Sequence, residues 1–294
     1  MPNLVRMMDS DGTLCVICAD TTETVREMQR LHGTKKVVSA ALGRLLTAAS
    51  LMGSMLKGEQ DSLTLKISAD GPASPLTAVS DSSGNVRGCA GRVDVELPLN
   101  ALGKLDVSGA VGKNGTLTVM KDLGLREPYI GQVPLATGEI AEDITAYYAA
   151  SEQTPSVCGL GVLCDRETEG ILNAGGFLIQ LLPTATDETI DKVERGLETI
   201  KPVTTMLFEG LNPEAICRAV LPEFTLEVLD TAEVGYRCTC SRERMERALV
   251  STGKQALSEM AEDPETEVIC NFCNQKYVFS QSEMQALARN ATRK

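Results

Sequence analysis

The sequence predicts an α+β protein with a mixed core domain (residues 1–184), a helical linker (185–230) and a small C-terminal domain containing close pairs of cysteines (231–294). Three observations support this prediction. Residues 37–56 are apolar on nearly every side of a helix, which is typical of a buried central helix. Residues 62–69 alternate apolar and polar side chains, as a half-buried strand does. Beyond the core the chain becomes acidic and helical, and the paired cysteines follow.

The core domain is predicted to mix strands and helices along the chain. Strand patterns occur at 13–19, 62–69, 75–95, 116–120, 156–164 and 171–182, and helix patterns occur at 21–32, 37–56 and 139–151. In the second of these strands, Leu63, Leu65 and Ile67 face one side and polar residues face the other. The alanines and glycines of 37–56 allow close packing, so we place this helix at the centre of the core.

The linker is predicted to dock on the core through one apolar stripe. Its members recur every three or four residues on an acidic helix and are Ile190, Val193, Leu197 and Ile200. A second helix starts at Asn212, a good N-cap that is followed by Pro213 at the first helical position. A short strand pattern at 224–230 ends the linker.

Four cysteines in the C-terminal domain form the cysteine cluster. Cys238 and Cys240 make a C-x-C pair, and Cys270 and Cys273 make a C-x-x-C pair after a spacer of 29 residues. Zinc prefers four tetrahedral nitrogen or sulfur ligands, and four thiolates leave no open coordination position. Two close pairs joined by a spacer let one chain wrap four ligands around one ion. The sequence therefore predicts a structural Zn²⁺ site, one ion per chain.

The elements around these cysteines can also be predicted. Ser241 is a good N-cap for a helix in the spacer, Asn274 can adopt a left-handed turn, and 276–279 has a strand pattern. Ser280 and Glu283 make a capping box for a last helix. So small a domain has a thin core, and metal binding can supply about 10–16 kcal/mol of its stability. Because thiolates are oxidisable, the spacing fits an oxidant sensor as well as an inert staple.

The charge distribution argues against nucleic acid as a partner. The chain has a net charge of −12, and residues 231–294 hold nine acidic and nine basic residues. No segment carries the basic excess that phosphate contacts require. The N-terminus has no apolar run of signal-peptide length, and no stretch reaches transmembrane length. We therefore expect a cytoplasmic protein with no membrane partner, in which ten cysteines indicate metal or redox chemistry.

The remaining cysteines and the single histidine do not suggest an enzyme. Cys15 and Cys18 make a C-x-x-C within a strand, where an offset of three puts side chains on opposite faces, so we interpret both as packing residues. Packing roles are also expected for Cys158, Cys164 and Cys217, while Cys89 has no partner near it in sequence. His32 has no second histidine for a metal site, and no nucleophile elbow, Walker A loop or dinucleotide fingerprint is present.

Several segments together resemble the redox-regulated 33-kilodalton heat-shock chaperone family, also called the 33 kDa chaperonin. They are SAALGRLLTAASLMGSMLKGE (39–59), GTLTVMKDLGLREPYIGQVPL (115–135), GEIAEDITAYYAASEQTPS (138–156), AGGFLIQLLP (174–183) and the C-x-C plus C-x-x-C end. They occur in order over nearly the whole chain. The resemblance implies an α+β core, a helical linker and a zinc domain that binds the metal through the cysteine cluster.

The resemblance also implies a mechanism. Members of the family are inactive when reduced and zinc-bound. Oxidants form two disulfides, which carry over to Cys238 with Cys240 and Cys270 with Cys273, release zinc and destabilise the linker. The protein then holds unfolding clients without ATP. We expect a homodimer when oxidised and a monomer or dimer when reduced. The six additional cysteines lie outside the family pattern.

Our candidate for the client-binding surface is the apolar stripe, together with the core surface beneath it. Two other interpretations of the chain make different predictions. A zinc-ribbon module that docks nucleic acid or protein predicts a basic face near the zinc, which the neutral balance of 231–294 disfavours. A thiol oxidoreductase using a C-x-x-C pair needs a βαβ context, which is missing around 270–273.

Overall fold

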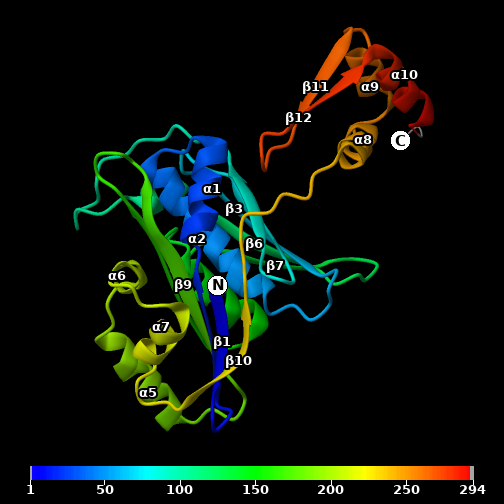
Figure 1. The fold of residues 1–294 in the computed structure, drawn as a ribbon. Helices are drawn as coiled ribbons and strands as arrows, with labels where there is room; N and C mark the ends of the chain where they lie inside the picture. The colour runs from blue at the N-terminus through cyan, green and yellow to red at the C-terminus, as the bar shows by residue number, and fades with distance from the viewer. Residues whose placement is uncertain (1, 292–294) are drawn as a thin grey trace. The chain divides into compact units, whose positions relative to one another are not determined.

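The computed structural model describes residues 2–291, and its mixture of helices and sheets confirms the predicted α+β class. Its contacts divide the chain into a first unit that ends at Arg237 and a second unit that starts at Cys238 (Figure 1). The three-part division at 184 and 230 stays a prediction. Within the described residues, no helix is long and apolar enough to cross a membrane.

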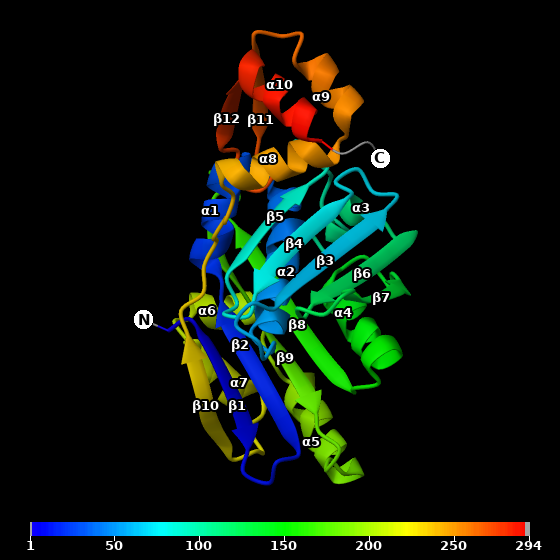
Figure 2. The same ribbon diagram turned by 90° about the vertical axis from the view of Figure 1, so that its right-hand side faces the viewer.

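The first unit contains two antiparallel sheets of five strands each, within residues 2–291 (Figure 2). The strands of the first sheet, in spatial order, are β10 (Leu226–Ala232), β1 (Leu4–Asp9), β2 (Leu14–Asp20), β9 (Ile171–Leu181) and β8 (Ser156–Cys164). Those of the second sheet are β5 (Val86–Ala90), β4 (Leu76–Asp81), β3 (Ser62–Ala69), β6 (Gly115–Asp122) and β7 (Tyr129–Pro134). Every neighbouring pair is antiparallel.

Helix α2 (Lys36–Gly53) lies at the centre of this unit, as the sequence predicts. It contacts strands of both sheets, and all its residues from Val37 to Gly53 are buried except Arg44, which is half-buried. At Gly43 a Cβ atom would lie 2.8 Å from Val25 and 2.9 Å from Val162. The small residue therefore permits the close approach of α1 (Thr22–His32) and β8. Short helices complete the unit at α3 (Val107–Val111) and α4 (Ala141–Tyr147), which runs into the π-helical turn η1 (Tyr148–Glu152).

The linker helices cover the other face of the first sheet. These helices are α5 (Asp187–Glu198), α6 (Val203–Phe208) and α7 (Pro213–Val220). Asn212 caps α7 by accepting a hydrogen bond from the Ala215 amide at 2.8 Å, as predicted. The outer cluster, formed between these helices and the sheet, includes Val16, Phe177, Ile179, Val193, Val203, Ile216 and Val220.

The prediction that four stripe residues dock together is wrong for one of them. Val193 is buried in the outer cluster, and Leu197 and Ile200 are half-buried against it. Ile190, in the first turn of α5, is 39% exposed and lies outside the cluster. Spacing places Ile190 on the correct side of the helix but does not say how far the underlying surface extends.

The chain returns to the first sheet after the linker. Strand β10, predicted at 224–230 and observed at Leu226–Ala232, pairs with β1, and Arg6 forms an ion pair with Asp230. Farther along, the hydroxyl of Tyr236 donates to the Gly88 carbonyl at 2.9 Å. These contacts attach the residues up to Arg237 to the first unit.

The second unit is a small α+β fold. Its elements are α8 (Arg242–Ser251), α9 (Lys254–Met260), β11 (Glu265–Ile269), β12 (Lys276–Ser280) and α10 (Gln281–Asn290), and β11 pairs with β12. The cap of α8 at Ser241 and the capping box of α10 at Ser280 and Glu283 are confirmed. The core is thin, with Leu249, Leu257, Phe279 and Met284 as its large buried side chains.

Candidate metal centre

The four thiols of the cysteine cluster converge in the second unit. Sγ of Cys238 lies 3.7 Å from Sγ of Cys270, and Sγ of Cys240 lies 3.4 Å from Sγ of Cys273. All four sulfur atoms lie within 4.8 Å of one another. Among the described residues this is the one group of three or more potential metal ligands.

The turn between β11 and β12 presents two of the thiols. The Cys270 amide donates to the Gln275 carbonyl at 3.0 Å, and the Asn274 amide donates to the Cys270 carbonyl at 2.9 Å. Asn274 has φ of 58°, the left-handed conformation expected from the sequence. Cys240 immediately precedes Ser241, the N-cap of α8.

The geometry fits a tetrahedral thiolate site. Four sulfur atoms, each 2.3 Å from one ion at tetrahedral corners, are about 3.8 Å apart, close to the separations between these thiols. Four sulfur donors favour a soft or borderline ion such as Zn²⁺ over Mg²⁺ or Ca²⁺. Because all four positions would be filled by protein, the arrangement is that of a closed site and not of a catalytic one.

The surroundings shift the pKa values of Cys238, Cys240 and Cys273 in different directions. Burial would raise the pKa of Cys240, but hydrogen bonds from the Tyr277 hydroxyl, at 3.1 Å, and from the other thiols leave that pKa lowered. Burial raises the pKa of Cys238 and of Cys273. Cys240 is therefore the thiol whose charged form is favoured, and the charged form is the one that binds metal and reacts with oxidants.

Five of the six remaining cysteines, all except Cys89, occupy packing positions. Cys15 contacts the cluster around α2, whereas Cys18 lies in the outer cluster, which confirms that they face opposite sides of β2. Burial raises the pKa of Cys15 to about 11, of Cys158 to about 12 and of Cys164 to about 11. Such thiols are almost entirely protonated near neutral pH and react slowly.

Two residues near the cluster were missed by reasoning from the sequence. Tyr277 donates to Cys240, and the guanidinium of Arg242 lies 4.2 Å from the centre of the Phe279 ring. Arg242 also pairs with Glu283 at 2.7 Å, which joins the start of α8 to the cap of α10. Neither residue belongs to a spacing pattern, although the position of Tyr277 in a strand directly after the C-x-x-C turn is a signal that could have been used.

Comparisons with known proteins agree on one family. A family model described as Hsp33 protein matches residues 3–280. The 33 kDa chaperonin of Clostridium beijerinckii is 47% identical over 289 residues and that of Bacillus cereus strain B4264 is 47% identical over 288, each match covering 98% of both chains. The crystal structure of the 33 kDa chaperonin (heat shock protein 33 homolog) of Thermotoga maritima matches with a TM-score of 0.88 at 35% identity, covering 99% of both chains.

Proposed function

Because the chain belongs to the Hsp33 protein family, we propose that it is a redox-regulated chaperone that holds unfolding proteins without ATP. The observation that carries this proposal is the convergence of four thiols within 4.8 Å in a unit with a thin core. In the resting state the cysteine cluster binds one Zn²⁺ as four thiolates and the chaperone is inactive. We place the protein in the cytoplasm, where a reducing environment keeps thiols reduced.

Oxidation of the cysteine cluster is the proposed switch. Cys238 pairs with Cys240 and Cys270 with Cys273, and each pair gives up two electrons as its S–S bond forms. With hydrogen peroxide as the oxidant, each disulfide consumes one peroxide and two protons and yields two waters. All four sulfurs lie within reach of one another, so the pairing of sequence neighbours is proposed on the family resemblance. Sulfurs held in disulfides no longer offer the thiolates that bind the metal, which is then released.

Release of the metal is expected to destabilise the second unit first. Its few large buried side chains leave metal binding as a major stabilising contribution, so we expect it to unfold once the thiols are oxidised. Within the linker, α5 is held more weakly than α6 and α7, because it contributes one buried side chain, Val193, and the half-buried Leu197 to the outer cluster. Burial of one such side chain stabilises by about 1.5–3 kcal/mol before the cost of ordering is subtracted.

Release of the linker is proposed to create the client-binding surface. Val193, Leu197 and Ile200 would become accessible together with the sheet face beneath them, while Ile190 is exposed already. An apolar patch of this kind suits partly unfolded clients. We propose that the oxidised protein acts as a homodimer and the reduced protein as a monomer or dimer, with no nucleic-acid or membrane partner and no catalytic reaction.

One experiment tests this function directly. Aggregation of a chemically unfolded client, followed by light scattering, should be suppressed by peroxide-treated protein and not by reduced protein. Zinc released to a chromogenic chelator in the same sample should reach one ion per chain as suppression develops. Zinc retention after peroxide, with no suppression, would show that the cluster is an inert staple.

A further inference from the structure

A groove of about 1010 Å³ runs along the outer edge of β8 in the first unit. One wall comes from the start of α2, a second from the loop at 95–105 and a third from the linker at 200–205. The floor is β8 itself, from Gly159 to Cys164. The groove lies wholly within the first unit and does not include the cysteine cluster.

The backbone at the floor of this groove is unpaired on its outer side. Strand β8 is the last strand of the first sheet, and β9 is its one strand partner among the described residues. The Cys158 amide donates away from the sheet, to the Thr145 hydroxyl at 3.2 Å, whereas the Pro155 carbonyl accepts from the Leu181 amide of β9. In an antiparallel pair such orientations alternate, so the amides and carbonyls of Leu160 and Val162 point outward.

These outward groups form a template for another strand. Within residues 2–291, no neighbouring segment hydrogen-bonds to the amide or carbonyl of Leu160 or Val162 across the outer edge. Proteins usually cover or blunt such edges, because an open edge pairs with any extended chain that reaches it. Here the edge lies along a groove of about 1010 Å³.

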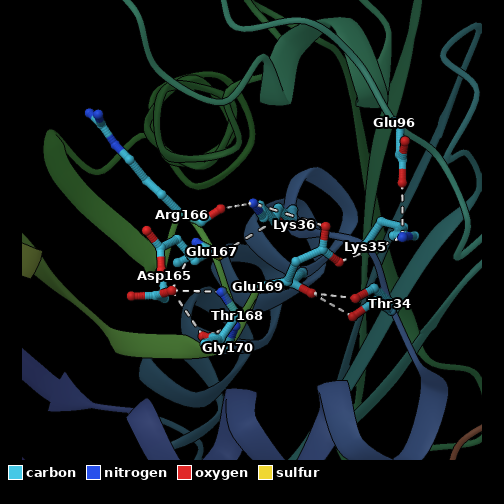
Figure 3. Close-up of polar contacts among 12 residues, drawn as sticks. Thr34, Lys35, Lys36, Glu96, Asp165, Arg166, Glu167, Thr168, Glu169 and Gly170 are labelled. Atoms are coloured by element: carbon cyan, nitrogen blue, oxygen red, sulfur yellow. Dashed lines mark hydrogen bonds and ion pairs between the residues drawn. The ribbon is translucent and has the colours of Figure 1, made fainter.

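The groove also carries an excess of positive charge in an acidic protein. Its lining contains six basic residues and three acidic ones, and they are Lys35, Lys36, Arg44, Lys104, Arg166 and Lys201 against Glu96, Asp165 and Glu169. Two of the six cations are paired outside the lining, Arg44 with Glu139 and Lys201 with Glu209, each at 2.6 Å. Nζ of Lys35 forms an ion pair of 2.9 Å with the carboxylate of Glu96, and Nζ of Lys36 donates a hydrogen bond to the carbonyl of Arg166 (Figure 3). Among the described residues, Lys104 and Arg166 have no carboxylate within ion-pair distance. The guanidinium of Arg166 points away from the other labelled residues in Figure 3.

Apolar side chains lie between these charges. Leu97 and Leu105 are half-buried on the loop wall, Leu99 is 57% exposed beside them, and Val203 lies on the linker wall. A strand added to β8 would present alternate side chains to opposite faces of the sheet. One row would meet apolar surface, and acidic residues in the strand would meet the free cations.

We propose that this groove binds an extended peptide segment of mixed apolar and acidic side chains, which adds to β8 as a further strand. Backbone hydrogen bonds to Leu160 and Val162 supply affinity without sequence preference, and Lys104 and Arg166 select acidic chains. The proposal goes beyond the proposed function, because the groove is open in the reduced protein, where most of the apolar stripe is still covered. It assigns such segments a site in the first unit that is distinct from the apolar stripe.

Peptide binding to the reduced, full-length chain tests the proposal. The probe is a fluorescein-labelled octapeptide of alternating valine and glutamate, measured by fluorescence anisotropy. It should bind at least tenfold more tightly than the same peptide with lysine in place of glutamate. It should also bind at least tenfold more tightly than the peptide methylated on its backbone amides, which cannot form the ladder. Equal binding of the methylated peptide would overturn the proposal.

Variants of the protein locate the site. Charge reversal at the groove, Lys104→Glu with Arg166→Glu, should weaken binding at least fivefold, whereas the matched reversal Lys57→Glu with Arg126→Glu at exposed positions outside the lining should not. Val162→Pro removes an outward amide that the sheet does not use and should weaken binding about tenfold. If that variant fails to fold, the charge pair and the methylated peptide still decide the matter.

Two further outcomes separate this proposal from its rivals. The protein could instead form a dimer that excludes the peptide and that dissociates in the Val162→Pro variant. This result would assign the edge of β8 to a second copy of the chain and overturn the proposal. If the protein does not bind the peptide but still suppresses client aggregation after peroxide treatment, the groove proposal is wrong and the proposed function stands. If the protein binds the peptide but does not suppress client aggregation after peroxide treatment, the groove proposal is supported and the proposed redox-regulated chaperone function is wrong.

Discussion

The hydroxyl of Tyr277 donates a hydrogen bond of 3.1 Å to Sγ of Cys240. This contact joins strand β12 to the C-x-C pair, 37 residues earlier in the chain. It favours the thiolate of Cys240, whose pKa is lowered. Tyr277 therefore stabilises the charged form of Cys240, in the way that groups which hydrogen-bond to metal ligands commonly do.

Tyr277→Phe should lower zinc affinity by roughly tenfold, because the thiolate at Cys240 loses its donor. Competition with a chromogenic chelator at pH 7 measures this change. Tyr236→Phe is the matched control, since it removes a hydroxyl that bonds to Gly88 in the first unit. Equal affinities for the two variants would show that the Tyr277 contact does not support the site.

Cys270→Ser should remove most of the bound metal from the reduced protein. Cys270 is buried and its Sγ lies 3.7 Å from Sγ of Cys238. Removing this thiol would leave three thiolates and one open coordination position. Metal content by mass spectrometry should fall from one zinc per chain towards zero. Cys89→Ser, outside the cluster, should keep the full content, and an unchanged content in Cys270→Ser would contradict the ligand assignment.

Replacement of Cys15 and Cys18 by alanine should leave the redox switch intact. The two side chains pack on opposite faces of β2 and cannot approach each other. Peroxide-treated protein should show no disulfide between them by peptide mass mapping. A Cys15–Cys18 bridge as a major product would contradict this prediction.

Glu152→Gln should destabilise the first unit in a pH-dependent way. Burial would raise the pKa of Glu152, but hydrogen bonds from Lys121, at 2.5 Å, and Tyr147, at 2.6 Å, leave it lowered from 4.5. The carboxylate therefore contributes stability above its unfolded pKa and loses that contribution as the pH falls through the folded value. The variant should lose roughly 1–3 kcal/mol at pH 7 and much less below pH about 4.

The free energies of unfolding of the unmodified protein and of Glu152→Gln are compared by urea unfolding at pH 7 and below pH about 4, followed by circular dichroism. Glu127→Gln, at an exposed loop position, should change little at either pH. A loss in Glu152→Gln that is the same at both pH values would show that the charged form of Glu152 contributes nothing.

Much of the fold follows from patterns that one segment carries by itself. The uniform apolarity of 37–56 predicts α2, the alternation of 62–69 predicts β3, and Asn212 with Pro213 predicts the start of α7. These signals depend on local propensity and on which side of an element is buried. The convergence of the four cysteines could also be predicted, because each pair is close in sequence and the chemistry of four thiolate ligands is specific.

The remaining features depend on contacts between distant segments. Strand β1 contains Arg6, whose partner Asp230 is supplied by β10, and nothing near Arg6 in sequence indicates that pairing. Strand β11 has an acidic sequence and was not predicted, because its partner β12 stabilises it across the turn that carries Cys270 and Cys273. The exposure of Ile190 likewise reflects where the outer cluster ends, a property of the assembled fold.

Activation by release of the linker, and not by metal loss alone, is the central claim, and Val193→Asp tests it most directly. Val193 is 4% exposed in the outer cluster, so a carboxylate there should undock α5 without touching the cysteine cluster. Ile190→Asp places the same charge at an exposed position on the same helix and should leave the reduced protein inactive with α5 docked. The measurement is client aggregation by reduced protein, with zinc content and hydrogen exchange of 187–220 followed in the same samples. Suppression by Val193→Asp with one zinc per chain and fast exchange is the predicted result, and fast exchange in a zinc-bound but inactive variant would contradict it.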